Sequence, residues 1–422
     1  MEHPEIIPHL FRTEFSKITS VLCKLFGLAH IETAEDIASE TFLAALETWP
    51  YKGIPENPVA WLYTVAKNKT RNKFSRERLF IEKIAPQIKQ ATTPNITEIE
   101  IDLSEKNISD SLLQMLFVVC HPAISIEAQI ALSLKILCGF SVEEIANAFL
   151  SNKEAINKRL YRAKETLRKE NINFVNLNTG VFSEPEMNKQ LETVLTTLYL
   201  LYNEGYYSES NDSILREDLC REAMRLTFLL IENNSTNLPN VNALYSLMCF
   251  HASRFAARKN ESGEIILYDE QDVTLWDQEL ISKGAYFLTQ ASTGNEISKY
   301  HLEANIAYWH TVKNDSKEKW ENILQLYNLL LQTEYSPIAA LNRTYALSKL
   351  SGKSKAIQEA EKLQLKNSPY YFALLGELYA NIDDKKSIDH FQTAYLLAKN
   401  EAEKNLLKRK IKRLNQQSNK LD

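Results

Sequence analysis

The sequence predicts an all-α protein of several domains. Glycine and proline, the residues that interrupt helices and mark turns, number only 10 and 12 in 422 residues. Leu, Ala, Glu, Lys and Ile recur along the chain at the three- and four-residue spacing of amphipathic helices. The length exceeds that of one typical domain, so two to three domains are expected. With 44% apolar residues, the chain is able to bury a core in each.

Several classes of protein do not fit the sequence. No apolar run approaches the roughly 20 residues that span a bilayer, and the first residues, MEHPEIIPHLFRTEF, lack the core of a signal peptide. We therefore expect a cytoplasmic protein without membrane contact. The chain has none of the HExxH, GxSxG, Walker or CxxC motifs, so we expect no enzyme, no catalytic residues, no cofactor and no metal. Five cysteines are scattered as reduced, buried thiols: Cys23, Cys120, Cys138, Cys220 and Cys249.

Changes in composition along the chain divide it into three helical regions. Residues 6–82 are consecutive amphipathic helices, and the polar, aperiodic stretch 83–108 is predicted to be a flexible linker. A second compact helical unit covers 109–170. After a short polar connector, a third helical region covers 188–415.

The first region contains an acidic helix followed by a basic one. Helix 34–49, AEDIASETFLAALETW, places Ile37, Thr41, Ala44, Ala45 and Trp49 inward and Asp36, Glu40 and Glu47 outward. After the turn-forming segment YKGIPENP, Asn57 and Pro58 fit the cap and first position of the next helix.

The second half of that helix concentrates positive charge in a chain whose net charge is −5. The basic residues are Lys67, Lys69, Arg71, Lys73, Arg76 and Arg78. Aromatic residues precede them: Tyr51, Trp61 and Tyr63. Positive charge beside stacking platforms is typical of surfaces that bind single-stranded nucleic acid. A plain basic patch at the end of a helix is the alternative.

The second region contains a pattern of two short helices. Ser141 with Glu144 is a capping box that starts a helix at Val142, and Ser151 with Glu154 repeats it after a three-residue turn. This arrangement is typical of the helix-turn-helix, whose second helix enters the major groove of DNA. The turn lacks the glycine that many such motifs have.

The outward face of the second helix carries most of the side chains that read or hold DNA. We expect this face to consist of Lys153, Asn157, Lys158, Arg159, Arg162, Lys164 and Arg168. Arginine and lysine pair with guanine edges or phosphates, and asparagine pairs with adenine. A structural helical hairpin with a solvated basic face is the alternative.

The third region shows a repeat of helical hairpins. In the segment 370–398, Leu375, Gly376 and Tyr379 belong to a first helix, a DDKK turn follows, and Ile388 and Phe391 belong to a second. The preceding segment has the same pattern around an SGKS turn, with a separation close to the roughly 34 residues of a tetratricopeptide repeat. An ordinary helical bundle is the alternative.

Together these segments resemble the sigma-70 family, in particular the extracytoplasmic-function sigma factors, which are DNA-binding specificity subunits of bacterial RNA polymerase. AEDIASETFLAALETW is similar to the polymerase-binding helix of sigma region 2, and NPVAWLYTVAKNKTRNKFSRER to its helix for the −10 promoter element. FSVEEIANAFLSNKEAINKRLYRAKETLR is similar to region 4, which reads the −35 element. VVCHPAIS, LYLLYNEGYYS, DEQDVTLWD and SPIAALNRTYAL resemble a subgroup with a long, tetratricopeptide-like extension.

The resemblance assigns roles residue by residue. Asp36 and Glu40 would contact the clamp helices of core polymerase, whose flap is a second contact, and loop 51–57 would capture a flipped-out −10 base. The −10 residues would be Asn57, Trp61, Lys67, Asn68, Arg71, Asn72 and Lys73. The −35 residues would be Lys153, Asn157, Lys158, Arg159, Tyr161 and Arg162, with Asn157 where many relatives have a basic residue.

We therefore expect a sigma factor that directs transcription initiation from promoter DNA, with a helical extension that regulates it and offers a site for a regulatory protein or peptide. The alternative is a helix-turn-helix activator with a tetratricopeptide scaffold that works without core polymerase.

Two local features of the sequence have more than one interpretation. Cys120 and His121 are a buried structural pair or a metal or thiol site. The acidic residues Glu204, Asp269, Glu270, Asp272 and Asp277 are a solvated face, a DNA mimic or a peptide site, and the stretch 269–277 is complementary to the two basic helices.

Overall fold

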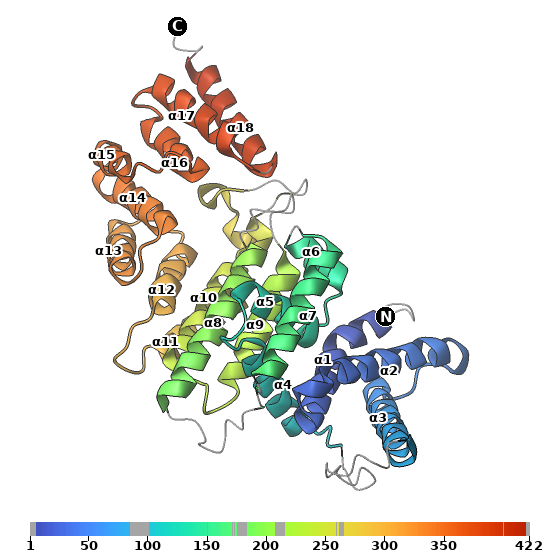
Figure 1. Cartoon of the computed structure of the whole chain (residues 1–422). Coiled ribbons are helices and arrows are strands. Elements are labelled where there is room, and N and C mark those ends of the chain that lie inside the picture. Colours follow the sequence, from blue (N-terminus) through green and yellow to red (C-terminus); the bar gives the residue numbers. More distant parts are fainter. Residues whose placement is uncertain are drawn as a thin grey trace. The chain divides into compact units, whose positions relative to one another are not determined.

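The computed structural model of the chain is helical throughout the part that it describes (Figure 1). The described residues are 6–84, 101–149, 151–170, 172, 174, 184–206, 216–258, 260, 266–399 and 401–418. All regular elements among them are helices, which confirms the predicted all-α fold class. Within these ranges no helix is long and apolar enough to cross a bilayer. The chain forms two compact units, residues 1–198 and 199–422, and the boundary falls inside helix α8.

The first unit begins with three helices. They are α1 (Ile6–Phe26), α2 (Ile31–Lys52) and α3 (Pro58–Ile84), with the short helix η1 (Leu28–His30) between the first two. Phe15, Ile18 and Leu22 recur at three- and four-residue spacing on α1 and are buried. The backbone of Gly53, at φ +80, ends α2, and its N–H donates to the carbonyl of Trp49.

The rest of the first unit consists of shorter helices, two of which pack on α1. Its elements are α4 (Glu105–Val119), α5 (Ile126–Leu132), the π-helical turn η3 (Ser133–Leu137), α6 (Val142–Ala148), α7 (Lys153–Lys169) and the first part of α8 (Glu184–Tyr206). α4 and η3 both lie against α1, and α4 is buried along most of its length. The sequence separated 6–82 from 109–170, whereas the structure packs them into one unit because α1 and α4 share an apolar core. Helix α4 begins inside the predicted linker 83–108, of which residues 85–100 lie outside the described residues.

The second unit is built from the end of α8 and ten further α-helices in the described ranges. They are α9 (Glu217–Ile231), α10 (Pro239–Ala252), α11 (Gln278–Ala291), α12 (Lys299–Thr311), α13 (Lys317–Thr333), α14 (Pro337–Ser351), α15 (Lys353–Leu363), α16 (Pro369–Tyr379), α17 (Asp384–Leu397) and α18 (Glu401–Ser418). Short 3₁₀ turns η4 (Phe255–Ala257), η5 (Tyr268–Glu270) and η6 (Val273–Leu275) lie between α10 and α11. Consecutive helices in this unit pack on one another as hairpins (Figure 1).

The two predicted hairpins are α14–α15 and α16–α17, with tighter turns than expected. Gly352 alone separates α14 from α15, and its φ of +86 is the left-handed region that glycine adopts without strain. The expected DDKK turn is instead the start of α17, because the Asp383 carboxylate caps that helix by accepting from the Lys386 N–H.

A serine and a phenylalanine one turn apart clamp a glycine in two of these helix pairs. In α16–α17, the Ser387 hydroxyl donates to the Gly376 carbonyl at 2.7 Å, and the Phe391 ring covers the glycine. In α10–α11, the Ser246 hydroxyl donates to the Gly284 carbonyl at 2.7 Å, and the Phe250 ring covers that glycine. A Cβ on either glycine would lie 2.7 Å from a ring atom, so these positions require the smallest side chain.

Candidate nucleic-acid interface

The start of α3 is held as the sequence predicted. The Asn57 side chain accepts from the Ala60 N–H at 2.9 Å, and Pro58 occupies the first helical turn. The Trp61 ring packs edge-on against Trp49, with 5.4 Å between ring centroids. Tyr51, at the end of α2, is 89% exposed. The last turn of α2 therefore carries an exposed aromatic ring, and the first turns of α3 carry one that is packed.

Of the other expected aromatic platforms, Tyr63 is committed to the protein itself. Its hydroxyl donates to the buried Glu14 carboxylate at 2.6 Å. Burial, together with that carboxylate, raises the pKa of Tyr63. Tyr63 therefore ties α3 to α1 and is not available for stacking on a base.

An exposed polar stripe follows on α3. Asn68, Arg71 and Asn72 have exposed side chains at the three- and four-residue spacing of one helix face. Lys67 and Lys73 are half-buried at its edges. The stripe offers amide groups and one guanidinium that point away from the core, which is the chemistry that holds phosphates and base edges.

The two acidic residues predicted to bind polymerase lie beside this basic helix. Asp36 and Glu40 on α2 are exposed, with side-chain exposures of 66% and 56%. The Lys73 ammonium lies 3.7 Å from the Asp36 carboxylate, and the Lys69 ammonium donates to Glu40 at 3.2 Å. One residue predicted to bind polymerase, Asp36, is thus paired with a predicted −10 residue, Lys73.

The helices α6 and α7 lie where a helix-turn-helix was predicted. The capping box at the start of α6 is formed, because Ser141 and Glu144 each accept the backbone N–H of the other. The second capping box was placed one residue early. The N-cap of α7 is Asn152, whose side chain accepts from the Ala155 N–H at 2.7 Å, rather than Ser151. Leu150, in the predicted turn, lies outside the described residues.

Helix α7 has a buried face and an exposed face, and the sequence did not assign every basic residue to the correct one. Ile156, Leu160 and Leu167 are buried as expected. The exposed face carries Lys153, Asn157, Lys158, Tyr161 and Arg162, and Arg159 is half-buried with its guanidinium over the Phe149 ring.

Lys164 and Arg168 were expected on this outward face, and that placement is wrong. Lys164 donates to Glu35 and Arg168 to Glu32, both on α2, so these two basic residues point into the protein. Glu35 compensates for the charge of the buried Lys164, whereas the Arg168–Glu32 pair stays partly exposed.

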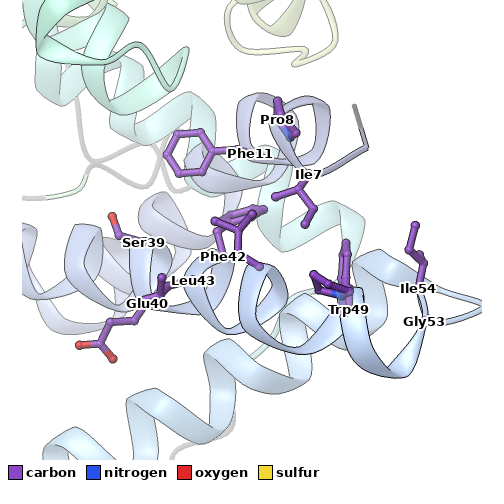
Figure 2. A pocket seen from close by; sticks show the side chains of 12 residues that line it. Ile7, Pro8, Phe11, Ser39, Glu40, Phe42, Leu43, Trp49, Gly53 and Ile54 are labelled. Carbon is purple, nitrogen blue, oxygen red and sulfur yellow. The ribbon is translucent and has the colours of Figure 1, made fainter. Parts of the chain in front are cut away.

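An apolar groove borders the same acidic helix, and sequence analysis missed it. Figure 2 shows the side chains of Ile7, Phe11, Phe42, Leu43 and Trp49 around a groove of about 1020 Å³ between α1 and α2. Leu43 and Leu46 are each 53% exposed, which is unusual for leucines on neighbouring turns. The only signal in the sequence was the run FLAALETW, which has apolar residues on more of the helix than one buried stripe requires.

The remaining candidate features are structural. The Cys120 thiol is buried with its sulfur 3.7 Å from the Ser133 hydroxyl, while the His121 ring accepts from the Ala123 N–H. Burial raises the pKa of the Cys120 thiol to about 12. In the described ranges, no three His, Cys, Asp or Glu side chains gather as metal ligands do.

The acidic stretch 269–277 is also used within its own unit. The Asp272 carboxylate accepts from the Thr274 N–H, and that of Asp277 caps α11 by accepting from the Leu280 N–H. Asp269 accepts from the Tyr345 hydroxyl at 3.3 Å and lies 3.6 Å from the Lys349 ammonium. Asp269, Glu270, Asp272 and Asp277 are all exposed, so the stretch is a solvated face whose carboxylates also accept hydrogen bonds within their own unit.

Comparisons with known proteins agree with this arrangement in part of the chain. Residues 10–80 match the model of sigma-70 region 2, and residues 190–292 match a family of unknown function, DUF6596. The ECF RNA polymerase sigma factor BldN of Streptomyces coelicolor is 32% identical over 139 residues, which are 32% of this chain and 49% of that protein. The RNA polymerase sigma factor YlaC of Bacillus subtilis is 27% identical over 169 residues, 40% of this chain and 94% of that protein.

One relative extends over most of the chain. An uncharacterized protein of Rhizobium meliloti is 31% identical over 378 residues, which are 89% of this chain and 88% of that protein. No solved structure matches the chain. The long relative shares both units, whereas the two sigma factors match only a part. The chain therefore belongs to the same family as the Rhizobium meliloti protein, and its residues 10–80 are a sigma-70 region 2 that relates its first unit to sigma factors of the ECF type.

Proposed function

We propose that the protein binds core RNA polymerase through α2 and directs it to promoters by reading the −10 element with α3 and the −35 element with α7. The observation that carries this proposal is the exposure of both predicted DNA-reading faces on helices whose opposite faces are buried. A helix fixed on one side and polar on the other presents its side chains to DNA in a defined register.

The −10 surface is the stripe of Asn68, Arg71 and Asn72 together with Tyr51 in front of α3. Amides and a guanidinium hold phosphates and base edges, and an exposed ring stacks on an unpaired base. Trp61 and Lys73 would contribute from the edges of the stripe, since the first packs on Trp49 and the second pairs with Asp36.

The −35 surface is the exposed face of α7. Asn157 and Tyr161 lie one turn apart on this face, as do Lys158 and Arg162, and Tyr161 is 61% exposed. Lys153 and Lys158 form exposed ion pairs with Glu143 and Glu154. Exposed pairs of this kind contribute about 0–1 kcal/mol, so DNA phosphates displace them easily.

The polymerase surface combines exposed carboxylates with the apolar groove. Asp36 and Glu40 supply negative charge, and Leu43 and Leu46 in the adjacent groove supply an apolar contact. Protein interfaces draw most of their affinity from such apolar anchors, while the charges at the rim set orientation and rate. With the groove, this surface has an apolar contact area in addition to the two acidic residues that the sequence assigned to it.

The second unit would regulate these activities by binding a protein or peptide. In support, its hairpins stack successively, as in repeat proteins whose surfaces bind other proteins. Asp269, Asp272 and Asp277 are occupied within the unit, so we do not assign the acidic stretch to the basic helices. A DNA-binding activator without core binding is the second candidate, and the same experiment separates the two.

The test is run-off transcription with core polymerase and the full-length protein. Asp36→Arg should abolish core binding in a pull-down, because charge reversal opposes a basic partner surface. Its matched control is Glu192→Arg, an exposed acid on α8, which should leave core binding unchanged. If Asp36→Arg binds core as the wild type does, the assignment of α2 is wrong, and DNA binding without core would favour the activator.

Arg162→Ala tests the −35 surface in the same assay. Loss of a base-edge contact costs about 1–3 kcal/mol and relaxes specificity at one position. Lys189→Ala, an exposed base on α8, serves as the control. If Arg162→Ala and Lys189→Ala bind the promoter equally well, α7 is not the recognition helix.

A further inference from the structure

Helix α18 carries a dense run of positive charge that the proposed function does not use. From residue 404 to residue 420 the sequence has seven basic residues and no acidic one, in a chain whose net charge is −5. A terminal helix of a repeat domain needs a polar outer face for solubility, but that face does not need a single sign of charge. Six of the seven basic residues lie on α18: Lys404, Lys408, Arg409, Lys410, Lys412 and Arg413.

The two faces of α18 have opposite character. Leu407 and Leu414 are buried in one core with Phe391 of α17, and Ile411 packs against that core. The helix is thus fixed along one side, while the other side presents four cations and two amides to solvent at the three- and four-residue spacing of one face. We call this exposed set the basic stripe: Asn405, Lys408, Arg409, Lys412, Arg413 and Gln416.

The charge of the basic stripe is not balanced by neighbouring acids. Lys408, Lys412 and Arg413 form no ion pair with any residue that the structure describes. Lys408 and Lys412 are four residues apart, as are Arg409 and Arg413, and like charges at this spacing destabilise a helix. The helix dipole does not account for the cations, because its effect is confined to the last turn, where α18 has no basic residue. An anionic partner would relieve this repulsion.

The chemistry of this face fits nucleic acid better than an acidic protein. Protein interfaces draw most of their affinity from apolar anchors, and no large apolar side chain is exposed in the described part of α18. A cleft of about 340 Å³ adjoins the stripe, but its wall mixes the carboxylates of Glu270 and Glu377 with cations, so it does not select an acidic side chain. Interfaces with DNA, by contrast, are polar and positively charged.

The length and composition of the stripe match the backbone of a duplex. From Asn405 to Gln416 the helix rises about 17 Å at 1.5 Å per residue, which is the axial length of about five base pairs at 3.4 Å each. Lysine, arginine and amide side chains are those that hold phosphate and sugar oxygens. Single strands are bound on aromatic platforms between cations, and none of the six residues of the stripe is aromatic.

We propose that the basic stripe of α18 binds the phosphate backbone of duplex DNA, which gives the second unit a DNA contact that is independent of sequence. The inference goes beyond the proposed function, because it does not depend on α3 or α7. A duplex that reaches both units is held more tightly than by either alone, since the second contact forms within one complex. Contacts with phosphates add affinity but no preference for a promoter.

The variants that test the stripe remove charge without shortening the side chains. Lys408→Gln, Lys412→Gln and Arg413→Gln are combined in one triple variant, because glutamine is nearly as good a helix former as lysine or arginine. The matched control removes three exposed lysines elsewhere on the second unit and so has the same net charge. It combines Lys355→Gln, Lys366→Gln and Lys385→Gln.

The first measurement is the affinity of the full-length protein for a labelled duplex of random sequence, about 40 base pairs long, between about 50 and 200 mM salt. Each phosphate contact contributes about 0.9 to the slope of log affinity against log salt concentration, so three lost contacts lower the slope by about 2.7. Over this range, the triple variant should therefore lose about 40-fold less affinity than the wild type. The control variant should keep the wild-type slope.

The second measurement locates the contact by photocrosslinking to the same duplex. A cysteine that carries an aryl azide is introduced at Gln416 of the stripe or, as a control, at Glu279, an exposed residue of α11. The five natural cysteines are buried and do not compete for the label. We expect crosslinked DNA with Gln416→Cys and none above background with Glu279→Cys.

Equal salt slopes in the triple variant and the wild type, or equal crosslinking from the two cysteines, would overturn the inference. A labelled polyglutamate peptide tests for an acidic protein instead. If the triple variant binds this peptide more weakly while it keeps the wild-type slope for DNA, the stripe is a protein-binding site and the inference is wrong. The proposed function fails separately, because Arg162→Ala leaves the stripe intact. Promoter binding that this variant does not change contradicts the role of α7 and leaves the results on α18 standing.

Discussion

The two units of the chain differ in the contacts that join their helices. In the first unit, α3 and α7 form ion pairs with α2, most of them exposed, in addition to the apolar core that holds the unit together. In the second unit, the α10–α11 and α16–α17 pairs close over glycines covered by phenylalanine rings. Exposed ion pairs contribute little to stability and are screened by salt. Close apolar packing is lost only when the two helices move apart and water enters between them.

This difference indicates which contacts can exchange partners at low cost in free energy. A surface that must release one charged partner and accept another is served by ion pairs, because the exchanged groups remain paired. A scaffold that must keep its shape is served by packing that tolerates no added atom. The first unit thus has contacts suited to exchange, and the second has contacts suited to persistence.

The largest effect is expected at the glycine clamp of the second unit. Gly376→Val should destabilise the α16–α17 hairpin by about 3 kcal/mol, because overpacking a filled core forces the Phe391 ring to move. Hydrogen exchange of the α16 and α17 amides in the full-length protein measures it. Adding Phe391→Leu should restore part of the loss. Unchanged exchange in the single variant would show that the hairpins are no more tightly packed than the first unit.

A smaller, pH-dependent effect is expected at a carboxyl group of the second unit. Burial raises the pKa of Glu303 on α12 to about 7, although the Tyr199 hydroxyl donates to its carboxylate at 3.2 Å. The folded state binds this proton more tightly than the unfolded state, so stability should fall as pH rises from about 4.5 to about 7.

Glu303→Gln is the variant that isolates this effect, because it is neutral at every pH. At pH 8 it should be about 1–2 kcal/mol more stable than the wild type, and at pH 5 the two should be similar. Urea unfolding at both pH values measures the difference. An equal difference at pH 5 and pH 8 would show that the carboxyl does not titrate between them.

The smallest effect on stability is expected at the exposed pairs of α3. Lys69→Ala and Lys73→Ala should each change the free energy of unfolding by less than about 1 kcal/mol, because their partners Glu40 and Asp36 stay hydrated. Urea unfolding in low and high salt measures it. A loss of several kcal/mol at either lysine would remove the contrast between exchangeable and persistent contacts.

Much of the local structure was predictable because its causes are close together in sequence. The Ser141 and Glu144 capping box and the Asn57 cap depend on residues three positions apart, and both are present. The buried stripe of α7 follows from the same short-range periodicity. The position of its N-cap was missed by one residue because Ser151 and Asn152 are both good caps, and the choice between them depends on backbone geometry.

The serine–phenylalanine clamps were not predictable from periodicity alone. Ser387 and Phe391 look like any small and apolar residues of an amphipathic helix. Their contact with Gly376 depends on how α17 crosses α16. The groove beside Leu43 was missed for the same reason, since its walls come from two helices.

By itself, the sequence determined the all-α class, the helices that carry positive charge and the buried stripe of α7. Only the tertiary structure decided that Lys164 and Arg168 face Glu35 and Glu32, and that Lys69 and Lys73 face Glu40 and Asp36. Periodicity separates polar from apolar faces, but a charged residue belongs equally to a solvated face and to one paired with an acid more than 100 positions away. Which of these holds depends on long-range packing, because a charge is buried only where an opposite charge meets it.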